Sequence, residues 1–99
     1  ALSLPATAGD TLSQKELRGL APGSYAVNVM GMVKMTVTLR SNGAVIGSAK
    51  GKRDSGYWTV QGQKLCIAWN TWLGGSRRCT ALQGDNGVYS GGGLSIRRI

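Results

Sequence analysis

The sequence lacks histidine and phenylalanine, and it holds few acids, prolines and cysteines. None of its 99 residues is His, 4 are Asp or Glu, 2 are Pro and 2 are Cys. Without an imidazole, catalytic triads and dyads that use histidine and histidine-dependent metal sites are excluded. The acids, Asp10, Glu16, Asp54 and Asp85, are far apart in the sequence, so a catalytic carboxylate pair would need two separate turns to meet.

Nucleotide and metal motifs are also missing. The chain has 16 glycines, yet it contains no P-loop, no dinucleotide fingerprint and no calcium loop. We therefore expect no enzyme and no cofactor. No stretch approaches the roughly 18 consecutive apolar residues that a membrane-spanning helix needs, so no transmembrane segment is expected.

What is present indicates one small globular domain. Hydrophobic residues make up 41% and charged residues 16% of the chain, within the range of folded domains. Residues 1–10 show no periodicity and are predicted to form a flexible N-terminal arm. Residues 11–99 are predicted to form a single β-barrel-like domain.

One short helix is predicted near the start of this domain. Ser13 and Glu16 have the spacing of a capping box, and Leu12, Leu17 and Leu20 can share one side of a helix that ends near Gly19. A helix this short is marginal alone. Its leucines are therefore expected to pack on a sheet.

Seven or eight short antiparallel strands follow, in a small meander barrel or a two-sheet sandwich. The clearest is residues 33–40, where apolar and polar residues alternate. A three-residue turn with Gly43 in the left-handed region would align Leu39 with Val45 and Val37 with Gly47, which keeps one face apolar. Further along the chain, Trp58 is predicted to lie opposite Leu65 in the core.

Residues 56–79 hold all three tryptophans and both cysteines. Cys66 and Cys79 lack the spacing of a redox motif, which leaves a structural disulfide or two inert thiols, and candidate adjacent strands favour the disulfide. A disulfide implies an oxidising compartment. The start at Ala1 lacks Met and a basic region and is similar to the end left by signal-peptide cleavage, so we expect a periplasmic or secreted protein.

The net charge of +8 is the other global feature. It either keeps a small protein soluble or attracts anionic polymers, glycans, lipid headgroups or nucleic acid. The predicted register sets Lys34 directly across from Lys50, and such a pair either splays into water or holds an anion. The candidate binding residues on this surface are Lys34, Lys50, Arg40, Lys52 and Arg53.

A second candidate site is the hairpin that contains Trp72, Arg77 and Arg78. An indole at a loop tip beside two guanidinium groups suits a sugar ring, a base or an anionic lipid head. Alternatively, Trp72 folds back to cover the core and the arginines are solvated.

Several structural residues resemble a pattern of small exported alphaproteobacterial proteins that are largely uncharacterised. The residues that carry the resemblance are Leu20, Gly23, Tyr25, Gly56, Trp58, Val60, Leu65, Cys66, Cys79, Gly87 and Tyr89. The resemblance implies an exported β-rich domain with one disulfide and transfers no functional residue.

The leading hypothesis is a non-catalytic exported binding protein whose basic surface engages an anionic envelope component or glycan. A second is an inhibitor of a secreted hydrolase, with residues 70–76 as the part that plugs the partner's cleft. A third, a nucleic-acid binder, fits the charge but not the expected export.

Overall fold

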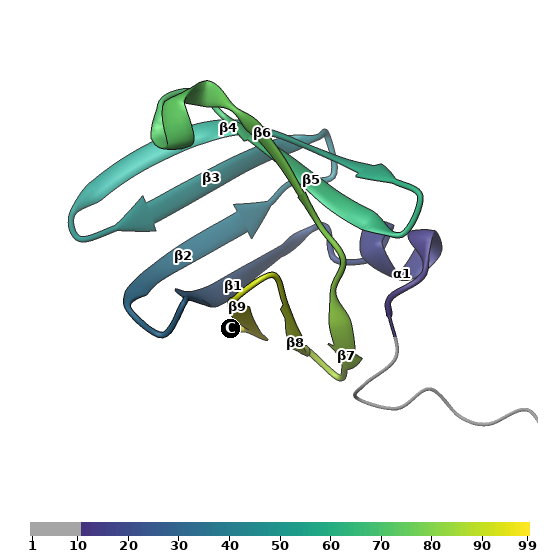
Figure 1. Cartoon of the computed structure of the whole chain (residues 1–99). Helices are drawn as coiled ribbons and strands as arrows, with labels where there is room; N and C mark the ends of the chain where they lie inside the picture. The colour runs from purple at the N-terminus through teal and green to yellow at the C-terminus, as the bar shows by residue number, and fades with distance from the viewer. Residues whose placement is uncertain (1–10) are drawn as a thin grey trace, which may run out of the picture.

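The structure, a computed structural model, describes residues 11–99, and the predicted flexible arm at residues 1–10 lies outside them. The described chain has one α-helix, one 3-10 turn and nine strands (Figure 1). The elements are α1 (Gln14–Arg18), β1 (Gly23–Val29), β2 (Val33–Leu39), β3 (Ala44–Ala49), β4 (Lys52–Gln61), β5 (Lys64–Trp69), η1 (Trp72–Gly75), β6 (Arg77–Thr80), β7 (Gln83–Asp85), β8 (Val88–Gly91) and β9 (Leu94–Arg98).

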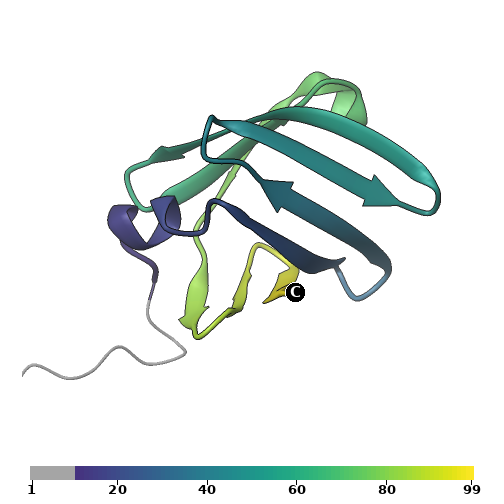
Figure 2. The same ribbon diagram turned by 180° about the vertical axis from the view of Figure 1, so that it is seen from behind.

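All nine strands belong to one antiparallel sheet in the order β6-β5-β4-β3-β2-β1-β9-β8-β7. Because β6 and β7 are consecutive in the chain but stand at opposite edges, the sheet curls until its edges approach each other (Figures 1 and 2). The result is a half-barrel of consecutive strands with a seam between β6 and β7. The predicted mainly β fold is confirmed, and the single sheet decides for the barrel-like alternative over the sandwich.

Close backbone contacts narrow this seam. A Cβ on Gly91, at the end of β8, would collide with the carbonyl oxygen of Ala81, in the segment that joins β6 to β7. Glycine is therefore required where the segment that joins β6 to β7 passes β8. The chain before α1 also contacts this segment: the amide of Leu12 donates a 2.8 Å hydrogen bond to the carbonyl of Leu82, which directly precedes β7.

The register of β2 and β3 is as predicted. Leu39 pairs with Val45 and Val37 with Gly47, around a turn in which Gly43 has φ 92°. The predicted pairing of Trp58 with Leu65 is wrong, because Trp58 pairs with Ile67. Gln61 pairs with Lys64 across a turn that begins with Gly62, whose φ is 57°. The register therefore differs from the predicted one by two residues, so the same face of each strand still points inward.

Two further expectations about the strands need correction. The sequence predicts seven or eight strands, whereas the described residues form nine, among them the short strand β7 (Gln83–Asp85). The ladder between β2 and β3 ends at the pair Thr36 and Ser48. Lys34 and Lys50 are therefore not paired across it, because Lys50 lies in the following turn with φ 51°.

The helix closes one end of the half-barrel. The capping box is formed: the Ser13 hydroxyl accepts from the amide of Glu16 at 3.1 Å, and the Glu16 carboxylate accepts from the amide of Ser13 at 3.0 Å. Leu12, Leu17 and Leu20 are all buried, as predicted. The helix thus covers the sheet with its leucines.

Candidate functional site

The inner face of the half-barrel encloses a cavity of about 700 Å³. Protein interiors normally contain few voids larger than a water molecule, whereas small-molecule sites measure about 300–1,000 Å³. The cavity is lined mainly by aliphatic, methionine and tryptophan side chains from most of the strands. The half-barrel therefore contains an apolar cavity alongside its buried hydrophobic core.

The inward positions of β3 explain part of this space. The inward residues of β3 are, in order, Val45, Gly47 and Ala49. The last two are small, whereas the strands that face them across the cavity carry larger side chains. The rings of Trp69 and Trp72 lie over Gly47, and a Cβ there would be 2.6 Å from an atom of each ring. Small inward residues thus leave room for the two indoles at one wall of the cavity.

The end of the cavity near α1 is closed. Leu20 and Tyr25 line it there, and the Tyr25 hydroxyl donates a 2.5 Å hydrogen bond to the carbonyl of Leu20. Burial raises the pKa of Tyr25, while the guanidinium of Arg98, 5.5 Å from the centre of the ring, opposes this shift in part. Tyr25 is therefore a neutral hydrogen-bond donor that seals this end.

The opposite end is open. Met30, Val33 and Leu73 line the cavity and are themselves 69%, 37% and 55% exposed. Exposed lining residues mark where a cavity opens, and the exposed Arg78 on β6 shows that the opening also reaches the edge of the sheet. Met30 lies in the turn that joins β1 to β2 and Leu73 lies in η1, so these exposed lining residues belong to two turns, which Figure 1 shows at the end of the molecule away from α1.

The η1 turn is tethered to the sheet rather than projecting from it. The carboxylate of Asp54 accepts hydrogen bonds from the amides of Thr71 (3.0 Å) and Trp72 (2.9 Å). These bonds, that from Trp72 above all, hold the pKa of Asp54 below its ordinary value against partial desolvation. Trp72 is half-buried against the core, so the alternative in which it folds back is correct, and Leu73 is the exposed residue of the turn.

Arg78 is the charged residue among the described residues that line the cavity. It pairs with the inward-facing Ile67, while its neighbour Arg77 pairs with Ala68 on the outer side. Arg78 is exposed at the edge of the sheet. A guanidinium at the border of an apolar cavity is suited to a carboxylate, phosphate or sulfate group.

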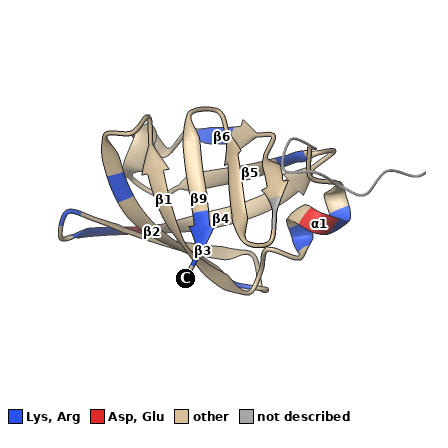
Figure 3. Ribbon diagram, turned by 90° about the horizontal axis from the view of Figure 1, so that it is seen from below, with Lys and Arg blue, Asp and Glu red and all other residues tan. Residues whose placement is uncertain are grey.

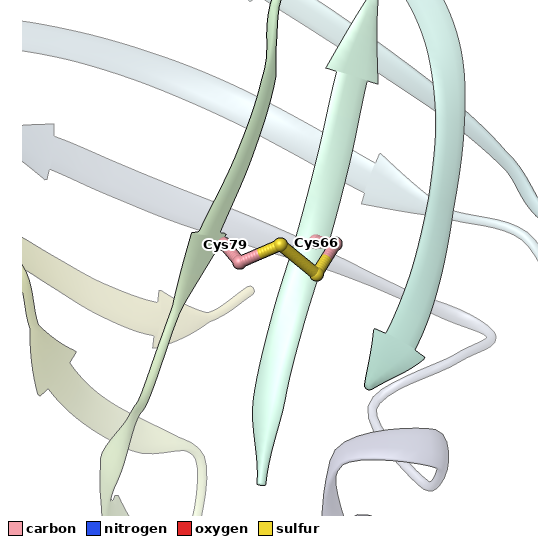
Figure 4. Close-up of a disulfide and its surroundings, with 2 residues drawn as sticks. All are labelled: Cys66 and Cys79. Carbon is pink, nitrogen blue, oxygen red and sulfur yellow. A yellow bond between two sulfur atoms is a disulfide. The ribbon is translucent and has the colours of Figure 1, made fainter. Parts of the chain in front are cut away.

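A disulfide fixes the strand that carries Arg78. Cys66 and Cys79 are directly opposite each other on β5 and β6, and their sulfur atoms are bonded, as the sequence predicts (Figure 4). The strand β6 has a single partner in the sheet. The bond therefore stabilises an edge strand next to the cavity mouth.

The other basic candidates do not form one continuous face. Lysine and arginine occur on β6, at the end of β9, on α1 and near the turns that follow β1 and β3 (Figure 3). Lys34, Lys50, Lys52 and Arg53 lie near these two turns, at the open end, whereas Arg40 is at the other end of β2. The structure thus separates Arg40 from the surface on which the sequence grouped it.

The cavity and its mouth are not predicted from the sequence. Met30, Val33 and Leu73 were not among the predicted site residues, because an apolar inward face is expected to be filled. A possible signal was the run of small inward residues Gly47 and Ala49 opposite large ones. Within the described residues, no group of three or more His, Cys, Asp or Glu side chains could hold a metal ion.

Comparison with known proteins identifies no relative. The chain matches no protein-family model, no curated protein and no solved structure. Within residues 11–99, no helix is long and apolar enough to cross a membrane.

Proposed function

We propose that the protein is a non-catalytic binding protein for an amphipathic anion with a single apolar chain. The observation that carries the proposal is the apolar cavity of about 700 Å³, which opens to solvent. An apolar cavity offers poor hydrogen bonding to water and binds apolar groups readily. In this proposal, the chain of the ligand occupies the cavity and displaces little ordered water.

Arg78 supports the anionic part of the proposal. It brings positive charge to the border of the cavity, where the head of an amphipathic ligand would emerge. Hydrogen bonds between charged partners contribute about 1.5–3 kcal/mol. An anionic lipid or fatty acid of the cell envelope fits both features, and export to the periplasm or medium, which the disulfide favours, would bring the protein to it.

In this proposal, the anionic ligand binds in the cavity rather than on the general basic surface. A surface of lysines alone would bind polyanions through screened contacts that weaken steeply with salt. A chain buried in the cavity would instead contribute free energy that salt does not weaken. Binding that persists at high salt therefore distinguishes the cavity from the general basic surface.

The test is a titration with decanoate, followed by the fluorescence of Trp69 and Trp72. Both indoles line the cavity, so saturable binding at one site should change their emission. Ala49 lines the cavity, and Ala49→Phe should weaken decanoate binding about tenfold or more by filling space that the chain needs. The matched control is Ser48→Phe, on the outer face of the same strand.

Wild-type protein that shows no saturable binding of decanoate or of longer alkyl carboxylates would refute the proposal. Equal affinities of the Ala49→Phe and Ser48→Phe variants would place the binding elsewhere than in the cavity.

A further inference from the structure

The open end of the half-barrel carries an unusual group of exposed apolar side chains, which we call the apolar rim: Met30, Met32, Val33 and Leu73. Their exposed fractions are 69%, 82%, 37% and 55%. Single exposed apolar residues are ordinary on protein surfaces, but a group of them marks an interaction site. Met30 and Met32 belong to the turn between β1 and β2, and Val33 is the first residue of β2.

The turn is held in a shape that presents these side chains. The amide of Met30 donates a 2.7 Å hydrogen bond to the carbonyl of Gly93, and the amide of Met32 donates a 2.9 Å bond to the carbonyl of Val29. Met30 and Gly31 have φ values of 54° and 70°. A residue other than glycine is uncommon in the left-handed region, so Met30 has a strained backbone conformation. Met32 nevertheless remains exposed to solvent.

Positive charge surrounds the apolar rim. Lys34 directly follows Val33, and Lys50, Lys52 and Arg53 lie at the neighbouring turn between β3 and β4, which reaches the same end of the molecule (Figures 1 and 2). All four side chains are exposed. The nearby carboxylate of Asp54 is engaged by the amides of Thr71 and Trp72.

We propose that the open end of the half-barrel docks on an anionic lipid bilayer. Flexible apolar side chains at a turn can enter the boundary between headgroups and acyl chains, and each lysine or arginine near an anionic surface contributes about 1 kcal/mol. A second copy of this chain is a poorer occupant, because it would bring the same lysines face to face. The apolar rim and the charges around it carry this inference without reference to what the cavity holds.

Docking would have one consequence for the cavity. Met30, Val33 and Leu73 belong both to the apolar rim and to the cavity lining. The mouth would face the bilayer, and an apolar chain could pass between membrane and cavity with little exposure to water.

The experiment is co-sedimentation with vesicles of phosphatidylcholine alone and of phosphatidylcholine with 30 mol% phosphatidylglycerol, at about 0.1 M salt where exposed charges still act over about 10 Å. We expect binding to the anionic vesicles and at least about tenfold weaker partitioning of Met32→Glu, which replaces an apolar side chain that would enter the bilayer with a negatively charged one. Val88→Glu is the matched control, since Val88 is 58% exposed on another strand.

The charges are tested by a second pair of variants. The double variant Lys34→Gln/Lys52→Gln should bind the anionic vesicles about tenfold or more weakly than the wild type. The control Lys15→Gln/Lys64→Gln, which removes two lysines near the helix end, should lose less affinity.

Each outcome bears on the proposal. Absence of binding to anionic vesicles, or equal loss in Met32→Glu and Val88→Glu, would overturn it. A dimer of the wild-type protein that Met32→Glu dissociates would assign the apolar rim to a second copy and overturn it as well. Met32 does not line the cavity, so its variant should bind decanoate normally. Absence of vesicle binding by the wild-type protein therefore counts against docking alone, and absence of decanoate binding by the wild-type protein counts against the proposed function alone.

Discussion

Trp72 packs against Trp69 with the ring centroids 4.9 Å apart and an angle of 56° between the ring planes. The contact joins the η1 turn to the last residue of β5 and builds one wall of the cavity near its mouth. Because Gly47 lies beneath both rings, the wall depends on a residue without a side chain.

Replacement of Gly47 by alanine should therefore disturb this wall. The added methyl group would overlap both indoles, and overpacking of this kind costs about 1–3 kcal/mol. We expect a lower urea midpoint and a changed tryptophan emission spectrum. Ser48→Ala, at the next position on the outer face, should leave both unchanged. A Gly47→Ala protein as stable as the wild type would show that the indoles are free to move.

Acid should release the η1 turn. Hydrogen bonds from the amides of Trp72 and Thr71 lower the pKa of Asp54, so its contribution to stability is complete above the ordinary aspartate pKa of about 3.9 and is lost as the pH falls through the lowered value in the folded protein. Near-UV circular dichroism of the tryptophans, recorded from pH 7 to pH 2, should show this step. Asp54→Asn should lack it and should show a looser turn already at pH 7.

Removal of the disulfide should cost more stability than any single surface change. Cys66 and Cys79 are 13 residues apart, and a loop of this size corresponds to about 3 kcal/mol in the chain-entropy model. Chemical denaturation of Cys66→Ser/Cys79→Ser should show this loss. The strand β6 should also exchange its amide hydrogens faster, and decanoate binding should weaken, because Arg78 lies next to Cys79. Equal stability of the reduced and oxidised proteins would contradict this account.

Arg78 should select for the charge of the ligand head. Arg78→Gln should weaken decanoate binding about 5- to 30-fold at low salt, the range expected for loss of a hydrogen bond to a charged group at a partly exposed site. Binding of decan-1-ol should change little. Arg77→Gln removes the same charge from the outer side of β6 and is the matched control. Equal effects of the two variants would assign the contribution to net charge alone.

Much of the fold could be predicted from local patterns. The capping box at Ser13 and Glu16, the alternation in β2 and the Gly43 turn each depend on residues close in sequence, and each is present. The candidate adjacent strands likewise favoured the disulfide, and Cys66 is opposite Cys79. Because local geometry determines these features, they could be predicted from the sequence.

The errors arose where long-range geometry decides. The strand β7 is too short to give a pattern and is defined by its partner β8. Lys34 and Lys50 are not paired, because the ladder between β2 and β3 ends at Thr36 and Ser48. The turn before β2 and the turn after β3 lie beyond this pair, toward the open end. The cavity depends on the curvature of the whole sheet, and an alternating apolar face does not distinguish a filled barrel from a hollow one.

The most direct test of the cavity is a methyl NMR spectrum of selectively labelled protein during a decanoate titration. Val37, Leu94 and Ile96 line the cavity, whereas Val88 and Ile46 point to the outer face of the sheet. The account predicts saturable shifts and decanoate-to-methyl nuclear Overhauser effects for the three inner residues, with the outer two unchanged. Shifts confined to outer methyl groups, or none at decanoate concentrations that saturate the fluorescence change, would contradict it.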